Sequence, residues 1–89
     1  KIKMNNWYVY ILLCKHDKLY TGIAQDVEKR FAMHKSGTGA RFTQRNKPMK
    51  IVYVEKCGSL SQARRREEAI KRLRKHQKEA IIRKNVKYL

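Results

Sequence analysis

The run from Trp7 to Cys14, WYVYILLC, is apolar on both of the faces that alternate along a β-strand. A strand with one face in water alternates between apolar and polar residues, but this run offers water neither face. We therefore predict a strand that is covered on both sides. The chain has 89 residues, enough for one compact domain and too few for two, so helices must cover a small sheet built around this strand.

Turn residues and apolar spacing predict the remaining elements. Asp26 is a suitable N-cap for a helix to about Lys35, with Val27, Phe31 and Ala32 on its inward face and Ser36-Gly37 at its end. Ser59 with Gln62 resembles a capping box that opens another helix. The predicted strands are 7–14, 19–23 and 50–56, with a turn at 15–18; the predicted helices are 26–35, 61–74 and 77–83, and 36–47 is an ordered loop. This order, ββαβαα, predicts a single α+β domain over 1–89 with a core at about 7–82.

The chain is very basic, because 23 Lys and Arg residues against 7 Asp and Glu give a formal net charge of +16. Solubility requires far fewer charges, and a phosphate backbone rewards an excess of cations by releasing its own counterions. A content of 42% hydrophobic residues indicates that the chain folds and is not a disordered basic tail. We predict a nucleic acid partner, DNA or alternatively RNA; an anionic membrane surface is the competing interpretation.

Cysteine usage and hydropathy further narrow the class of protein to which the chain can belong. Cys14 and Cys57 lie in apolar strand-like runs, which favours buried free thiols in a reducing, cytoplasmic environment over a disulfide. His16, His34 and His76 have no cysteine pair at zinc-finger spacing. The opening apolar run of 8 residues is too short to span a bilayer. No obligate protein partner is indicated.

One carboxylate falls where an apolar residue is expected. Ala63, Glu67 and Ile70 are spaced i, i+4 and i+7 and share one face of the second long helix, whereas Glu68 points elsewhere. A carboxylate aimed at the interior must be paired, protonated or bound to a metal. Glu67 is therefore either a metal ligand or half of an ion pair with a neighbouring arginine.

Polar groups suited to phosphate chemistry occur in the first half of the chain. Arg30 and His34 are one helical turn apart, so they project from the same flank; a solvated basic face with a histidine near the helix end would look the same. Tyr10 and Tyr20 lie in predicted strands, where tyrosine is common. Gly22 weakens its strand unless another group approaches the backbone closely.

Taken together these positions resemble the GIY-YIG nuclease family. Tyr8-Val9-Tyr10 stands where the family has Gly-Ile-Tyr, and Tyr20-Thr21-Gly22 where it has Tyr-Ile-Gly. Arg30, His34 and Glu67 then follow in the family's order and spacing over roughly residues 7–82. The stretch Gly39-Ala40-Arg41-Phe42-Thr43, with Arg45 and Pro48, looks like the small stand-alone branch. The fold implied is a three-stranded antiparallel sheet flanked by helices.

The resemblance implies a nuclease that hydrolyses phosphodiester bonds with one divalent cation, Mg²⁺ or Mn²⁺. It implies that Glu67 holds the cation and that Arg30 stabilises the transition state. Tyr10 and Tyr20 would position the attacking water, one of them as its base, with His34 accepting or orienting a proton. A phenol needs a nearby cation or hydrogen bond for this role, and the sequence does not decide between the two tyrosines.

The sequence departs from the family pattern at four places. Tyr8 replaces the first glycine, Thr21 replaces an isoleucine, and Ile23 stands where some members carry a lysine. Asn85 matches only loosely an asparagine found near the end of several relatives. These positions lie outside the predicted catalytic side chains.

Substrate contacts are expected from the basic residues beside the predicted site, namely Arg41, Arg45, Lys47 and Arg64. So small a domain offers a limited footprint, which favours single-stranded or branched DNA over recognition of a long sequence. Trp7, Tyr8 or Phe42 could stack on unpaired bases, although core packing is their alternative role. The alternative function is a catalytically inactive nucleic-acid-binding module of the same fold. A peripheral membrane protein lacks the apolar helix face that it needs.

Overall fold

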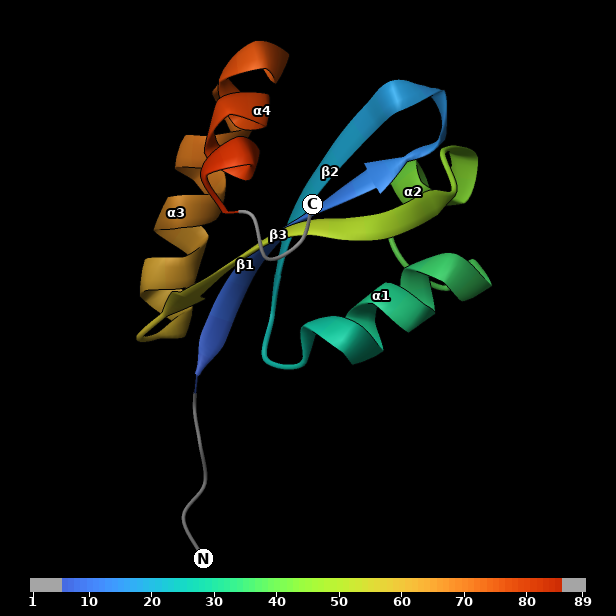
Figure 1. Cartoon of the computed structure of the whole chain (residues 1–89). Helices are drawn as coiled ribbons and strands as arrows, with labels where there is room; N and C mark the ends of the chain where they lie inside the picture. Colours follow the sequence, from blue (N-terminus) through green and yellow to red (C-terminus); the bar gives the residue numbers. More distant parts are fainter. Residues whose placement is uncertain (1–5, 86–89) are drawn as a thin grey trace, which may run out of the picture.

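The computed structural model describes residues 6–85 and confirms the predicted α+β class. Three antiparallel strands form one sheet in the order β2-β1-β3, with β1 in the centre. The elements are β1 (Trp7–Cys14), a 3₁₀ turn (Lys15–Asp17), β2 (Lys18–Ala24), α1 (Val27–Ser36), α2 (Arg41–Arg45), β3 (Pro48–Cys57), α3 (Leu60–Lys71) and α4 (Lys75–Lys84). All three predicted strands are therefore present (Figure 1).

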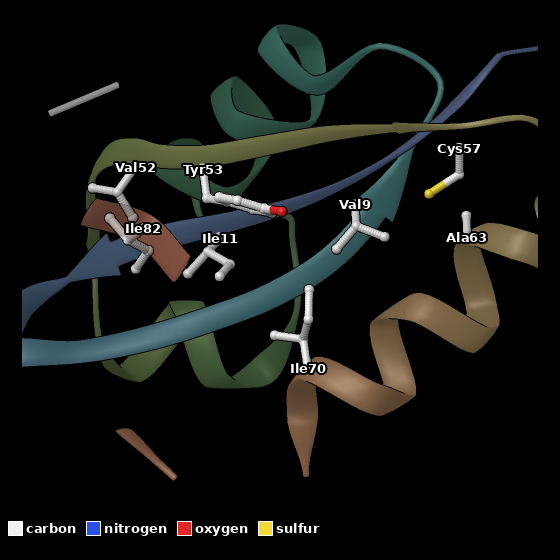
Figure 2. Packing of buried hydrophobic residues seen from close by; sticks show 8 residues of the cluster. All are labelled: Val9, Ile11, Val52, Tyr53, Cys57, Ala63, Ile70 and Ile82. Carbon is white, nitrogen blue, oxygen red and sulfur yellow. The ribbon is translucent and has the colours of Figure 1, made fainter. Parts of the chain in front are cut away.

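The central strand β1 is covered on both faces, as its composition predicts. Val9 and Ile11 are fully buried on the face that packs against Ala63 and Ile70 of α3 and against Ile82 of α4 (Figure 2). The alternate residues of β1 form a second cluster on the opposite face, with side chains of α1: Tyr10, Leu12 and Cys14, packed with Val27 and Phe31. Figure 1 shows α3 and α4 on one side of the sheet and α1 and α2 on the other.

Local capping fixes the starts of α1 and α3 at the predicted positions. The Asp26 carboxylate accepts the Lys29 N–H at 3.0 Å and opens α1, and Gly37 ends that helix in the left-handed conformation (φ 89°). Ser59 caps α3 by accepting the Gln62 N–H at 3.2 Å. These hydrogen bonds satisfy donors that a helix start otherwise leaves exposed.

Three predicted details were wrong. The second long helix ends at Lys71, before the predicted Arg74, and α4 begins at Lys75, where the Gln77 side chain accepts the Arg74 N–H at 2.9 Å. The turn between the two helices lets α4 return Ile82 to the core. Ala32 is exposed, so the inward face of α1 is narrower than expected.

The third difference is α2, which lies inside the predicted loop 36–47 and changes the order to ββααβαα. This helix has five residues, and its backbone is closed by the Asn46 N–H, which donates to the Phe42 carbonyl at 2.9 Å. One side chain of α2, Thr43, is buried. So short a helix has no apolar period that a sequence could reveal, and tertiary contacts hold it in place.

Both cysteines are buried and free, in agreement with the sequence. Burial raises the pKa of the Cys14 thiol to about 11, so this sulfur is an inert core atom at neutral pH. Within residues 6–85 there is no helix with the length and apolar content that crossing a bilayer requires.

Thr21, the residue at the isoleucine position of the family pattern, is 4% exposed, and its hydroxyl has no hydrogen-bond partner among residues 6–85. An unsatisfied buried hydroxyl is destabilising. We expect Thr21→Val to raise the free energy of unfolding by about 1 kcal/mol, because it keeps the shape and removes the polar atom. Thr21→Ser, which keeps the hydroxyl and loses a methyl group, should be less stable than the parent. Urea unfolding of the three proteins measures both changes, and a destabilised valine variant would contradict the assignment.

Candidate active site

The two predicted tyrosines face the same side of the sheet near its β2 edge. Tyr10 of β1 is paired with Gly22 of β2, and Tyr20 lies two residues from that glycine, so both side chains project toward α1. Their ring centroids are 6.4 Å apart. A Cβ atom at Gly22 would stand 2.6 Å from the Tyr10 hydroxyl oxygen. Glycine at this position therefore lets the Tyr10 ring lie directly over the β2 backbone.

His34 joins the tyrosines from the last turn of α1. It is 2% exposed, and its Nε2 atom lies 2.9 Å from the Tyr10 hydroxyl. The Tyr20 ring packs edge-on against the imidazole at a centroid distance of 5.0 Å. Gly39 closes the other side of the ring, because a Cβ atom there would stand 2.2 Å from Nδ1. This burial does not fit a solvated histidine at a helix end.

Thr43 determines which imidazole nitrogen carries the proton. The Thr43 hydroxyl donates its one proton to the Ala40 carbonyl at 2.8 Å, so it must accept from the His34 Nδ1 atom, also at 2.8 Å. The Ala40 N–H lies farther from Nδ1, at 3.4 Å, and the two shorter contacts outweigh it. With its proton on Nδ1, neutral His34 presents the lone pair of Nε2 to Tyr10, and the Tyr10 hydroxyl donates to it.

Burial and neighbouring charges keep Tyr10, Tyr20 and His34 uncharged at neutral pH. Burial, followed by the neighbouring Tyr20, raises the pKa of the Tyr10 phenol far above its ordinary value, and the Arg30 charge offsets only part of that rise. Burial also raises the pKa of Tyr20, against the lowering effect of Lys71. Burial and the Arg30 charge lower the pKa of His34, which is therefore an uncharged proton acceptor at neutral pH.

Arg30 and Glu67 approach the tyrosines from opposite sides of the sheet. Arg30 is exposed on α1, and Glu67 belongs to α3, yet both charges act on the two phenols. The Glu67 side chain is 19% exposed and pairs with Lys71, whose Nζ lies 3.2 Å from a carboxylate oxygen. Its partner is a lysine of the same helix, not the arginine considered above. All five predicted catalytic residues thus lie around the two phenols: Tyr10, Tyr20, Arg30, His34 and Glu67.

Glu67 suits a cation that keeps most of its water. Residues 6–85 hold no group of three or more His, Cys, Asp or Glu side chains that could enclose a metal ion. A single partly exposed carboxylate leaves most coordination positions to water and substrate oxygens, the arrangement in which proteins commonly bind Mg²⁺. The donor set therefore fits one hard divalent cation and does not fit a structural zinc.

The predicted substrate contacts surround this group of residues. Arg41 and Arg45 are exposed on α2, and Lys47 lines a hollow beside His34 and Thr43. Arg64 lies in a second hollow with Arg65 and Glu67. Asn85 lies elsewhere, since its side chain donates to the Val54 carbonyl of β3 at 3.2 Å and fastens the end of α4.

Two residues of the site had been given no role from the sequence. Thr43 stands in the quoted Gly39–Thr43 stretch, but its bond to His34 depends on a helix that the sequence did not reveal. Lys71 carried a signal, because it follows Glu67 by four residues, the spacing of a helical ion pair.

Comparisons with known proteins identify the family of the chain. Residues 6–80 match the family model described as the GIY-YIG catalytic domain. The UPF0213 protein of Staphylococcus haemolyticus is 44% identical over 79 residues, covering 89% of this chain and 96% of that protein. The UPF0213 protein of Cupriavidus necator is 45% identical over 75 residues, covering 84% of this chain and 82% of that protein.

A solved structure extends the match to three dimensions. The solution NMR structure of the UPF0213 protein BH0048 from Bacillus halodurans is 37% identical, with a TM-score of 0.57 over 93% of this chain and 86% of that one. The family match covers most of the chain and contains all five predicted catalytic residues, so this protein belongs to the GIY-YIG family of nuclease domains.

Proposed function

We propose that this protein is a metal-dependent DNA endonuclease that hydrolyses phosphodiester bonds, preferably in single-stranded or branched DNA. The observation that carries the proposal is the buried chain of hydrogen bonds from Tyr10 through His34 to Thr43. Such a chain has a donor, an acceptor and a fixed tautomer, which is what proton transfer from an attacking water requires. Packing alone would not need that order of polar atoms in the interior.

In the proposed reaction the Tyr10 oxygen takes a proton from the attacking water while its own proton passes to Nε2 of His34. Tyr10 then never has to exist as a free phenolate, which its raised pKa forbids at neutral pH. Of the two tyrosines, Tyr10 is proposed for this step because it has a hydrogen-bonded acceptor for its proton. Tyr20, which is less buried, helps to orient the water.

Two charged residues complete the proposal. Arg30 is exposed and its guanidinium neutralises the charge that develops on the phosphate during attack. Glu67 would hold Mg²⁺ or Mn²⁺, which polarises the phosphate and stabilises the leaving oxygen when bound. Arg41, Arg45, Lys47 and Arg64, all exposed around the site, would hold the DNA backbone without reading its sequence.

We predict that Glu67→Ala lowers the cleavage rate by at least about a hundredfold on single-stranded, duplex and branched DNA with Mg²⁺ or Mn²⁺, because it removes the carboxylate at the reacting phosphate. The matched control is Glu68→Ala on the same helix, whose side chain is 73% exposed and should leave cleavage nearly unchanged. Chelation of divalent cations should abolish wild-type cleavage. Equal cutting by wild type and Glu67→Ala would refute the proposal, and salt-sensitive binding with no cleavage would establish the inactive binding module instead.

We predict that Thr43→Val lowers the free energy of unfolding by about 1–3 kcal/mol, because the buried Nδ1–H of His34 loses its acceptor. The same variant should lower kcat more than it changes KM, since the ring is no longer held in one tautomer. Thr43→Ser keeps the hydroxyl and should restore kcat toward the wild-type value. Single-turnover cleavage and urea unfolding measure the two effects; a valine variant with wild-type kcat would rule out an orienting role for Thr43.

The lowered pKa of His34 determines how cleavage should depend on pH. His34 accepts a proton only when neutral, and its pKa is lowered from the ordinary value of 6.5, so kcat/KM should stay level as pH falls to 6.5 and decline only at lower pH. Stability should fall in the same direction, because below 6.5 the unfolded chain binds a proton at His34 more readily than the folded chain does. Cleavage and unfolding measured across this range test both statements. An acidic limb that begins above pH 6.5 would contradict the assigned role.

A further inference from the structure

Phe42 is an exposed aromatic residue that the proposed reaction does not use. It is 37% exposed on α2, and it stacks on Tyr20 with a centroid distance of 5.9 Å and an interplanar angle of 28°. The adjacent Thr43 is 1% exposed and anchored to His34, so α2 holds the aromatic ring in a fixed position. A phenylalanine kept partly in water next to a catalytic side chain has a free surface that a ligand could cover.

Phe42 forms one wall of a groove of about 330 Å³. The remaining walls come from the 3₁₀ turn, which supplies His16 and Asp17, from the start of β2, which supplies Lys18 and Leu19, and from α4, which supplies Lys75 and Lys78. The groove passes the free edge of β2, on which no further strand pairs within residues 6–85. Its Phe42 wall stacks on Tyr20, so the groove lies next to the candidate active site.

The charge of the groove is strongly positive. Lys18, Lys75 and Lys78 line it. Lys75 is paired with the acidic lining residue Asp17 at 2.6 Å, which leaves the charges of Lys18 and Lys78 for a ligand. A wall of lysines attracts a phosphate backbone, and an aromatic face beside it stacks on a nucleobase. Bases inside a duplex are already stacked on one another, so only an unpaired base can use such a face.

We propose that this groove binds an unpaired nucleotide of a single DNA strand, with its base stacked on Phe42 and its phosphates against Lys18 and Lys78. The inference rests on the proposed nuclease function and deepens it, since it places a single-stranded segment next to Tyr20. Preference for single-stranded or branched DNA then follows from a binding site and not from the basic charge alone.

The test is binding measured apart from cleavage, by fluorescence anisotropy with labelled oligothymidylate, its RNA counterpart oligouridylate, and a fully paired duplex, all with divalent cations chelated. Phe42→Leu keeps an apolar side chain and removes the aromatic face, so its Kd for oligothymidylate should rise at least about tenfold, whereas duplex binding should change less than about twofold. Phe42→Tyr should retain wild-type affinity. Weaker binding of oligouridylate than of oligothymidylate is expected, and the reverse would assign the groove to RNA and overturn the proposal for DNA.

Abasic substitution separates stacking from a general effect on the fold. Replacing the bases of the oligonucleotide with abasic sites should weaken wild-type binding about tenfold but weaken binding to Phe42→Leu little, because the partner of the base is already missing. Lys18→Gln and Lys78→Gln should instead lower the salt dependence of binding for every ligand. Met49→Ala is the matched control, since Met49 is an apolar residue of β3 that is 57% exposed. Thermal unfolding of each variant confirms that the fold is intact.

These binding measurements can fail or succeed independently of the cleavage assays that test the proposed nuclease. If Phe42→Leu binds single strands as wild type does, or loses the same affinity for duplex and abasic DNA, the groove has no stacking role even when the wild type cuts DNA. If the stacking effect is present but wild type cuts nothing with Mg²⁺ or Mn²⁺, the groove stands as a single-strand site and the proposed endonuclease activity fails.

Discussion

Burial of β1 on both faces is the constraint on which the other elements depend. One face of this strand needs α3 and α4, and the other needs α1, so eight residues determine that the chain must supply two helical layers. The same alternation sends Val9 and Ile11 into one layer and Tyr10 into the other. Because Tyr10 belongs to the core and to the candidate site at once, its hydroxyl is held by the packing that stabilises the domain.

Much of the fold could be read from the sequence because its signals are local. Apolar runs marked the three strands, and Asp26 and Ser59 marked the starts of α1 and α3. The short helix α2 was missed since five residues carry no period, and the exposure of Ala32 depends on how α1 packs against its neighbours. The end of α3 at Lys71 was not predicted, because it depends on a turn that lets Ile82 of α4 reach the core.

In the candidate site, too, some residues could be predicted from the sequence and others only from tertiary contacts. Resemblance to a known family singled out the tyrosines, Arg30, His34 and Glu67, but it could not say that one tyrosine has an acceptor for its proton and the other has none assigned. That distinction arises from a hydrogen bond between residues 24 positions apart. The role of Thr43 needed a further tertiary contact, because a threonine in a loop is ordinarily a turn residue. Side chains that act directly leave a pattern in sequence, and those that orient them become visible only in the folded chain.

The close contact at Gly22 also bears on how the hairpin of β1 and β2 assembles. A strand pair can slip by one residue, and each slip turns every side chain to the opposite face. In the observed register the Tyr10 ring lies over the one residue of β2 that has no side chain, and any other alignment would bring a Cβ atom against the ring. The glycine therefore favours the observed register over the alternatives while the domain folds. A substitution there would affect folding yield and kinetics as well as chemistry.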